Sequence, residues 1–178
     1  MAADLNLLDP ALKNTMTQVL ARCRAAGVEM RPNNGLRNPH DQAKLWRQSR
    51  SLEEIEAKID EFESQGAPYL AACLKEVGPQ HGEHVTNAAP GFSWHQWGQA
   101  VDCFWLVDGK AEWSSSKLIN WKNGYQVYAA EAKALGLFPG GYWKSFKDWP
   151  HIQLQIHGSP NVNKSVKEID QEMQLRYA

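Results

Sequence analysis

Hydrophobic residues recur with the period of a helix in several parts of the chain. Between residues 10 and 26 apolar side chains return every three or four positions, after the start signal Asp9-Pro10 and before Gly27. The same spacing predicts further helices after Pro39, after the capping box that opens at Ser51, after Pro68, between residues 120 and 136, and after Ser165. The sequence therefore predicts six helices.

Two other segments alternate between polar and apolar residues, which is the period of a strand. They are residues 100–105 and residues 151–156. A short strand is also expected at residues 28–30, before the turn-forming Asn33-Asn34-Gly35. This order of helices and strands predicts an α+β fold, with a small antiparallel sheet flanked by helices.

Length, charge and cysteine content narrow the class of protein. A chain of 178 residues suits one domain with a substantial core, and we expect a single domain over residues 1–178. A net charge of −1 gives no basic surface and argues against nucleic-acid binding. The three cysteines are widely spaced without a CxxC pair, so neither a disulfide framework nor a thiolate zinc site is expected. Cys103, although next to Asp102, is expected to be a buried apolar thiol.

The N-terminal segment and the lengths of the apolar runs indicate where in the cell the protein is made. The N-terminus MAADLNLLDPALKN has no basic segment followed by an apolar one, so it does not predict a signal peptide. No apolar run approaches the roughly 20 residues of a membrane span. We therefore expect a protein made in the cytoplasm, without a membrane span, that works as a monomer.

Four residues with metal and proton chemistry lie in two short segments. His95 and Asp102 are seven positions apart, so a straight strand would place them on opposite faces, and the chain must bend near Gly98. His151 begins the second predicted strand, on the face that also carries Gln153 and Gln155. If the two strands pair, His95, Asp102 and His151 can converge.

Two imidazoles and one carboxylate are a common ligand set for catalytic zinc, with a fourth position left for water or substrate. Asp148, three residues before His151, is placed to act as a general base. Taken singly, a histidine is more often structural, and Asp148 before Trp149-Pro150 can be a turn residue. The combination favours the metal site, and the ligands alone leave other divalent ions open.

The motifs Ser93-x-His95-x-x-Gly98-x-Ala100-x-Asp102 and Asp148-x-Pro150-His151 resemble those of a known family. It is the zinc-dependent D-Ala-D-Ala carboxypeptidase and L-alanyl-D-glutamate endopeptidase family, the LAS-type metallopeptidases, whose wider group includes the zinc-bearing domain of hedgehog proteins. The resemblance implies an LAS-type fold with one zinc ion at the sheet. It implies zinc bound by His95, Asp102 and His151, with Asp148 as the catalytic acid and base.

An upstream segment, Gly35-Leu36-Arg37-Asn38-Pro39-His40-Asp41-Gln42, is similar to a third family element. The resemblance implies that Arg37 stabilises the oxyanion and that Gln42 supports it. Without the resemblance, Arg37 would be interpreted as part of a surface ion pair. Ser93 can orient a ligand or substrate by a hydrogen bond, or it can serve as a local turn hydroxyl.

Two regions lie outside this pattern. The helical segment at about residues 51–87 is longer than a minimal family member needs, and it is predicted to be an insertion that forms a wall of the cleft or a substrate-binding lobe. The C-terminal helix at about residues 165–176 carries no recognisable motif.

The leading functional hypothesis is a zinc-dependent peptidoglycan peptidase that cuts stem peptides, most naturally at the L-alanyl-D-glutamate bond. Without a signal peptide, a phage or prophage endolysin released to the periplasm by a holin fits this chemistry. A D-Ala-D-Ala carboxypeptidase or dipeptidase is the alternative enzyme. A zinc-stabilised binding domain without hydrolysis ranks lower, because Asp148 and Arg37 complete the catalytic set.

Overall fold

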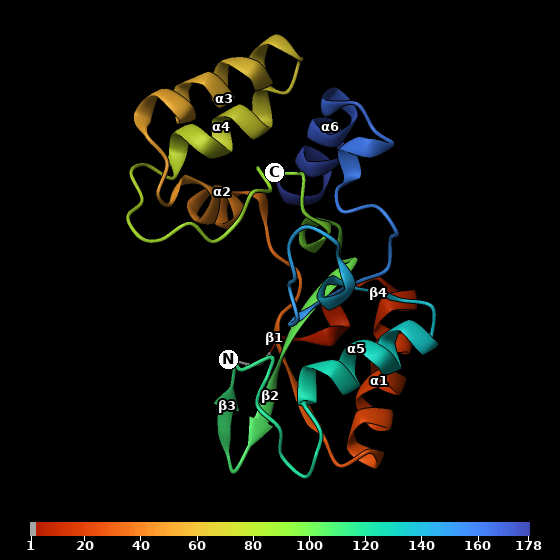
Figure 1. The fold of residues 1–178 in the computed structure, drawn as a ribbon. Coiled ribbons are helices and arrows are strands. Elements are labelled where there is room, and N and C mark those ends of the chain that lie inside the picture. Colours follow the sequence, from red (N-terminus) through yellow and green to blue (C-terminus); the bar gives the residue numbers. More distant parts are fainter. Residues whose placement is uncertain (1–2) are drawn as a thin grey trace. The chain divides into compact units, whose positions relative to one another are not determined.

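The computed structural model describes residues 3–178, which form two compact units (Figure 1). The first, called here the sheet unit, contains the described residues up to Leu36 and the segment Trp97–Ile156. The second, the helical unit, contains Arg37–Gln96 and His157–Ala178. The single peptidase domain over residues 1–178 stays a prediction, and each unit is described by itself.

The sheet unit is built on an antiparallel sheet of five strands. The path of the sheet is β1 (Glu29–Asn34), β2 (Ala100–Val107), β5 (His151–Gln153) and β4 (Phe138–Pro139), and β3 (Lys110–Glu112) pairs with β2. Two helices, α1 (Pro10–Ala25) and α5 (Gly124–Ala134), pack against each other. This topology makes β2 and β5 neighbours, although they are far apart in the sequence.

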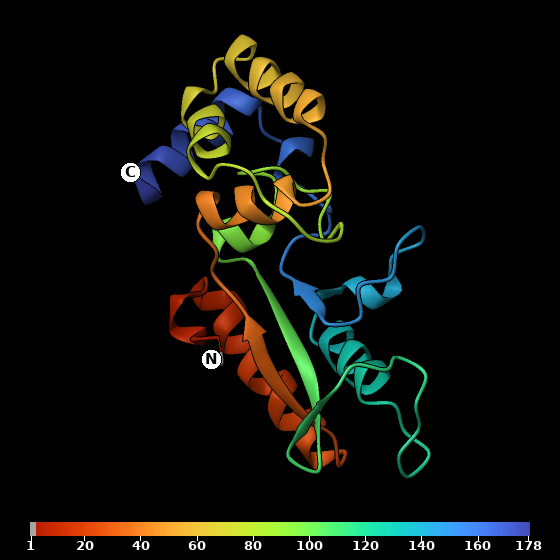
Figure 2. The ribbon, with the colours of Figure 1, turned by 90° about the vertical axis from the view of Figure 1, so that its left-hand side faces the viewer.

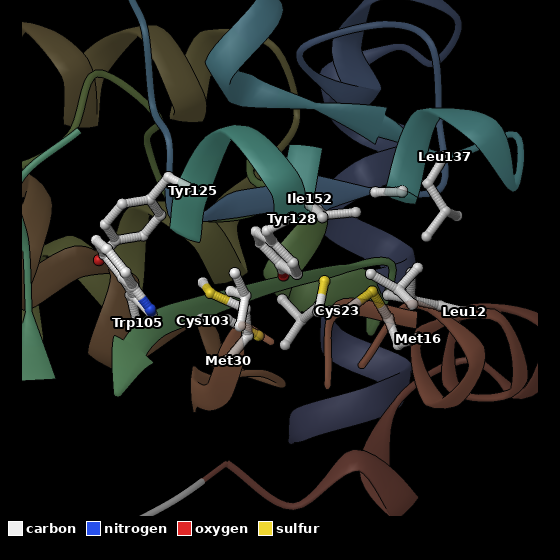
Figure 3. Packing of buried hydrophobic residues seen from close by; sticks show 14 of the residues in the cluster. Leu12, Met16, Cys23, Met30, Cys103, Trp105, Tyr125, Tyr128, Leu137 and Ile152 are labelled. Carbon is white, nitrogen blue, oxygen red and sulfur yellow. The ribbon is translucent and has the colours of Figure 1, made fainter. Parts of the chain in front are cut away.

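The core of the sheet unit lies between α1, α5 and the sheet (Figure 3). Its buried side chains include Leu12, Met16 and Cys23 from α1, Tyr125 and Tyr128 from α5, Val101, Cys103 and Trp105 from β2, and Ile152 from β5. Because successive strand residues point to opposite faces, this arrangement directs Asp102 away from the core. Burial also raises the pKa of Cys103 to about 12, which confirms the predicted inert thiol.

The helical unit contains α2 (Pro39–Arg47), α3 (Leu52–Ser64), α4 (Pro68–Glu76) and α6 (Val166–Tyr177). The C-terminal helix α6 packs against α4 (Figure 2). Fully buried side chains join these helices, among them Phe62, Leu70, Leu74, Ile169 and Met173. Across residues 3–178, no helix combines the length and the apolar character that a membrane crossing requires.

The α+β prediction is confirmed, and so are the capping box at Ser51 and the start of the last helix at Ser165, which also forms a capping box. The helical part of the expected insertion ends at Glu76, and residues 77–87 form an irregular loop. The helix expected between residues 120 and 136 spans Gly124–Ala134. These differences concern boundaries, where capping and turn residues compete with helix formation.

The predicted boundaries of two strands are wrong. Asn33 and Asn34, expected in a turn, belong to β1, which lies at the sheet edge and pairs with β2 through a shifted register. An edge position also tolerates Pro32, which has no N–H to donate. The strand expected to reach residue 156 ends at Gln153, whose side-chain amide donates to the carbonyl of Gln155 and so favours a local turn. Ile156 is consequently exposed.

The N-terminal cap of helix α4 is provided by a residue of helix α6. Ala67 provides no capping side chain, and Oδ1 of Asp170 accepts a hydrogen bond from the backbone N–H of Leu70 at 2.8 Å. We expect Asp170→Ala to lower the free energy of unfolding by about 1 kcal/mol, the usual cost of a lost cap. Asp170→Asn keeps an acceptor and should cost less. Urea unfolding of both variants tests this, and equal losses would show that the acceptor is not what stabilises α4.

Candidate metal centre

Asp102 and His151 are direct partners across the antiparallel pair of β2 and β5. Nδ1 of His151 donates a hydrogen bond to Oδ1 of Asp102 at 3.0 Å, and both side chains are largely buried. Nε2 of His151 lies 3.0 Å from Oε1 of Gln153 on the same strand. The predicted pairing of the two strands is therefore confirmed, and its register brings two of the three predicted ligands together.

Two carboxylates raise the pKa of the His151 imidazole. Burial lowers this pKa, but the hydrogen bond to Asp102, the charges of Asp102 and Asp148 and the hydrogen bond to Gln153 together outweigh burial. The local field therefore favours positive charge at His151. A field of that sign is also favourable for a bound cation.

The chain bends between His95 and Asp102, as the spacing of the motif predicts. Trp94–Trp97 forms a 3-10 turn, and Gly98 follows it with φ of 68°, in the left-handed region that glycine adopts readily. A Cβ at Gly98 would lie 3.2 Å from the backbone nitrogen of Asp9, which donates to the carbonyl of Gly98 at 2.9 Å. The bend is thus fixed by a close backbone contact that a side chain would disturb.

His95, Asp102 and His151 each offer one ligand atom, and these atoms all lie within 4.8 Å of one another. Zinc is bound at about 2 Å by imidazole nitrogens and carboxylate oxygens, which are the atoms that these three residues offer. Two imidazoles and a carboxylate also match the donor set of catalytic zinc sites. The residues predicted as zinc ligands therefore fit one ion.

Asp148 is held next to His151 by a tight turn. The carbonyl of Asp148 accepts a hydrogen bond from the backbone N–H of His151 at 3.2 Å, and its own N–H donates to the carbonyl of Gly140 at 3.1 Å. A Cβ at Gly140 would lie 2.5 Å from the carbonyl oxygen of Asp148 and 3.2 Å from Cβ of His151. Position 140 therefore admits no side chain, and the close approach of Gly140 supports the backbone of Asp148.

The guanidinium of Arg37 contacts the predicted supporting residue. Nη1 of Arg37 donates a hydrogen bond to Oε1 of Gln42 at 2.8 Å, and Gln42 is fully buried. The hydroxyl of Ser93 accepts from the backbone N–H of His95 at 3.4 Å, and its carbonyl accepts from Gln96 at 3.0 Å. These two contacts match the local turn role for Ser93, the second of its two predicted roles.

Three residues near these groups were not predicted to have a role. Gln153 contacts His151, Gly140 supports Asp148, and the fully buried Gln96 donates to Oε1 of Gln42 at 2.9 Å. Gln96 lies inside the first motif, between His95 and Gly98, but glutamine in a motif carries no distinctive chemistry. Gln153 shares a strand face with His151, so alternation along β5 could have indicated its contact, whereas the role of Gln96 depends on a contact with a distant segment, which spacing along the chain does not reveal.

A second group of side chains resembles a nucleophile with its base. It consists of Cys73, His40 and Glu76, each in contact with the next. Sγ of Cys73 lies 3.8 Å from Nδ1 of His40, and Nε2 of His40 lies 2.9 Å from a carboxylate oxygen of Glu76. Burial raises the pKa of Cys73 to about 12, so the thiol stays protonated at neutral pH. This group is therefore structural, because the thiolate is the nucleophilic form.

A family profile covers most of the chain. The profile named VanY, described as D-alanyl-D-alanine carboxypeptidase, matches residues 5–129. The chain belongs to the VanY family. The match includes Arg37, His95 and Asp102, and it ends before Asp148 and His151. The chain is thus identified as a peptidase of the VanY type, and the later half of the proposed site rests on the geometry of β5 and of the turn that precedes it.

Two curated relatives share sequence with this VanY-family chain. One is the peptidoglycan L-alanyl-D-glutamate endopeptidase CwlK of Bacillus subtilis (strain 168), 26% identical over 150 residues, which are 83% of this chain and 73% of the relative. The other is the L-alanyl-D-glutamate peptidase of Listeria phage A118, 32% identical over 103 residues. That alignment covers 56% of this chain and 35% of the phage protein.

Solved structures also show similarity. The L-Ala D-Glu endopeptidase ChiX of Serratia marcescens has 21% sequence identity and a TM-score of 0.42, over 85% of this chain and 83% of the other. The vancomycin resistance D,D-pentapeptidase VanY, in complex with Zn(II), has 19% identity and a TM-score of 0.46, over 92% of this chain and 78% of the other. Membership of the VanY family rests on the sequence match alone.

Proposed function

We propose that this VanY-family peptidase is a zinc enzyme that hydrolyses the L-alanyl-D-glutamate bond of peptidoglycan stem peptides. The observation that carries the proposal is the cross-strand pair of Asp102 and His151, with Asp148 held in the turn that precedes His151. His95 adds the second imidazole of the ligand set. This combination provides both a cation site and a base.

The proposed mechanism assigns a task to each residue. His95, Asp102 and His151 hold one zinc ion, which when bound polarises the scissile carbonyl and lowers the pKa of water to about 7. Asp148 takes a proton from the attacking water and later gives it to the leaving amine. Arg37, held by Gln42, donates hydrogen bonds to the carbonyl oxygen as it becomes negative. Ser93 supports the turn that carries His95.

Two observations bear on which bond is cut. The two curated relatives are named for the L-alanyl-D-glutamate bond, and they favour the endopeptidase. The matched family profile is described as a D-alanyl-D-alanine carboxypeptidase, and it favours the second candidate, which releases D-Ala. A zinc-stabilised binding domain is the weakest candidate, because Asp148 and Arg37 are both present.

The phage relative favours a biological role as a phage or prophage endolysin. In this role the protein is made in the cytoplasm, a holin gives it access to the periplasm, and it acts there on the cell wall as a monomer. Its partner is the peptidoglycan stem peptide. The net charge of −1 favours neither nucleic acid nor an acidic surface as a partner.

Digestion of purified peptidoglycan followed by mass spectrometry tests the proposal. We expect fragments with a newly exposed D-Glu amine, and we expect none after a chelator has removed the metal. Free D-Ala as the main product would support the carboxypeptidase instead. Intact peptidoglycan in the presence of zinc-loaded protein would contradict both enzymes and leave the binding domain.

A further inference from the structure

In the helical unit, the guanidinium of Arg37 contacts a network of buried side-chain amides. Oε1 of Gln42 accepts hydrogen bonds from Nη1 of Arg37 at 2.8 Å and from Nε2 of Gln96 at 2.9 Å. Nε2 of Gln42 donates to the carbonyl of Ala88 at 2.7 Å and to the hydroxyl of Thr86 at 3.4 Å. Both ends of the Gln42 amide are therefore saturated, which fixes its orientation.

The amide of Gln96 is oriented by the backbone of the preceding loop. Its Oε1 accepts from the N–H of Gly91 at 2.8 Å and from the N–H of Ser93 at 3.4 Å. The oxygen must face these donors, so the NH₂ group must face Gln42. Turning either amide over would set donors against donors or oxygens against oxygens, which is costly at buried positions.

The C-terminal helix α6 holds the backbone of this loop at two points. The hydroxyl of Tyr177 donates to the carbonyl of Gln96 at 2.7 Å. Gly91, with φ of 83°, lies so close to α6 that a Cβ there would be 2.6 Å from Cγ2 of Ile169. The helix that carries no sequence motif therefore supports both ends of the segment from Gly91 to Gln96.

We propose that Gln96 is a positioning residue for Arg37. Its NH₂ group holds Gln42 with Oε1 toward the guanidinium, and α6 fixes Gln96 through Tyr177 and Gly91. The inference rests on the proposed function, in which Arg37 stabilises the negative oxygen of the transition state. A guanidinium acts in this way only if its direction is set before the reaction begins.

Gln96→Glu is the sharpest test, because it preserves size and reverses polarity. The new carboxylate still accepts from Gly91, but it cannot donate to Oε1 of Gln42, and two oxygens then face each other. Gln42 has to turn or withdraw, so Nη1 of Arg37 loses its hydrogen bond to Oε1 of Gln42. We expect kcat for stem-peptide cleavage to fall by at least tenfold, toward the roughly 10²-fold cost of losing one oxyanion donor, with KM little changed.

A double-mutant cycle separates positioning from general destabilisation. In an Arg37→Met background, Gln96→Glu should cause almost no further loss of kcat, because the two changes remove the same interaction. If Gln96→Glu lowers kcat by the same factor in both backgrounds, Gln96 does not act through Arg37. Equal zinc content and an unchanged melting temperature of Gln96→Glu establish that the comparison is made on folded protein. If Gln96→Glu does not fold, the same double-mutant cycle is measured with Gln96→Met, because methionine is also close to glutamine in size.

A spectroscopic readout keeps this inference distinct from the proposed function. In ¹H–¹⁵N spectra of the full chain, the Arg37 side-chain signal, assigned by its absence in Arg37→Met, should shift in Gln96→Glu. This shift is expected whether or not the protein cuts peptidoglycan, and an unchanged signal overturns the positioning role. Inactive wild-type protein with the shift present would contradict the proposed function only.

The contribution of α6 is tested on the same readouts. Tyr177→Phe removes one hydroxyl from the network. It should lower kcat by a smaller factor than Gln96→Glu does, and it should shift the Arg37 signal in the same direction but by less. Leu175→Ala is the matched control, since Leu175 is on the same helix and is 82% exposed. Equal effects of the two changes would show that α6 does not act through the Tyr177 hydroxyl.

Discussion

Replacing Asp148 with asparagine should lower the rate of stem-peptide cleavage by about 10²–10⁴-fold, the usual contribution of a positioned general base. The side chain keeps its size, and the turn with Gly140 and His151 is made by backbone groups, so the local fold should persist. Asparagine cannot take a proton from the attacking water. Steady-state kinetics on purified muropeptides measures the loss, and metal analysis should show that zinc is still bound.

Asp60→Asn is a suitable control for this substitution. Asp60 is an exposed residue of α3, in the helical unit, so the same chemical change there should leave cleavage unaffected. Full activity of Asp148→Asn would exclude Asp148 as the base. Loss of zinc together with activity would instead indicate that Asp148 helps to hold the cation.

Removing the metal should abolish cleavage, and added zinc should restore it. His151→Ala should show neither recovery nor strong zinc binding. Loss of a supporting partner alone costs about 10–100-fold in metal affinity, and loss of a ligand should cost more. Zinc that binds only the folded state also stabilises that state. The gain is about 2.7 kcal/mol when the zinc concentration is 100 times the dissociation constant. Calorimetric titration and thermal unfolding, each with and without zinc, measure both effects.

His84→Ala controls for the loss of an imidazole. His84 is exposed and contacts Asn87, away from the proposed ligands in the sequence. We expect wild-type zinc affinity and cleavage from this variant. If His151→Ala bound zinc as tightly as His84→Ala does, the ligand set of His95, Asp102 and His151 would be incorrect.

The helices and the two long strand segments could be predicted because each follows from local periodicity and capping. The short strands β3 and β4 could not, since three and two residues are too few to show alternation. The end of β5 was missed for another reason. Residues 154–156 continue the alternating pattern, but a side-chain bond from Gln153 to the backbone of Gln155 competes with the ladder.

The predicted metal ligands and the predicted base share one property, which is that the residue type itself indicates the chemistry, whereas Arg37 and Gln42 were predicted from the resemblance to a family. Histidine and aspartate at motif spacing indicate ligands and a base, and the bend at Gly98 followed from an odd separation along a strand. Gln96 and Gly140 lack such a signal. Gln96 has a role through amide orientation, and Gly140 through the space that its missing side chain leaves to Asp148.

The direct pairing of Asp102 with His151 has an evolutionary consequence. Their contact is set by strand register, so it does not depend on the 48 residues between them, and lengthening a flexible loop costs little. Insertions in the irregular stretch before α5 would leave the pair intact, whereas one residue added within β2 would turn Asp102 toward the core. Natural variation in length should therefore gather between the two motifs and avoid the strands that carry them.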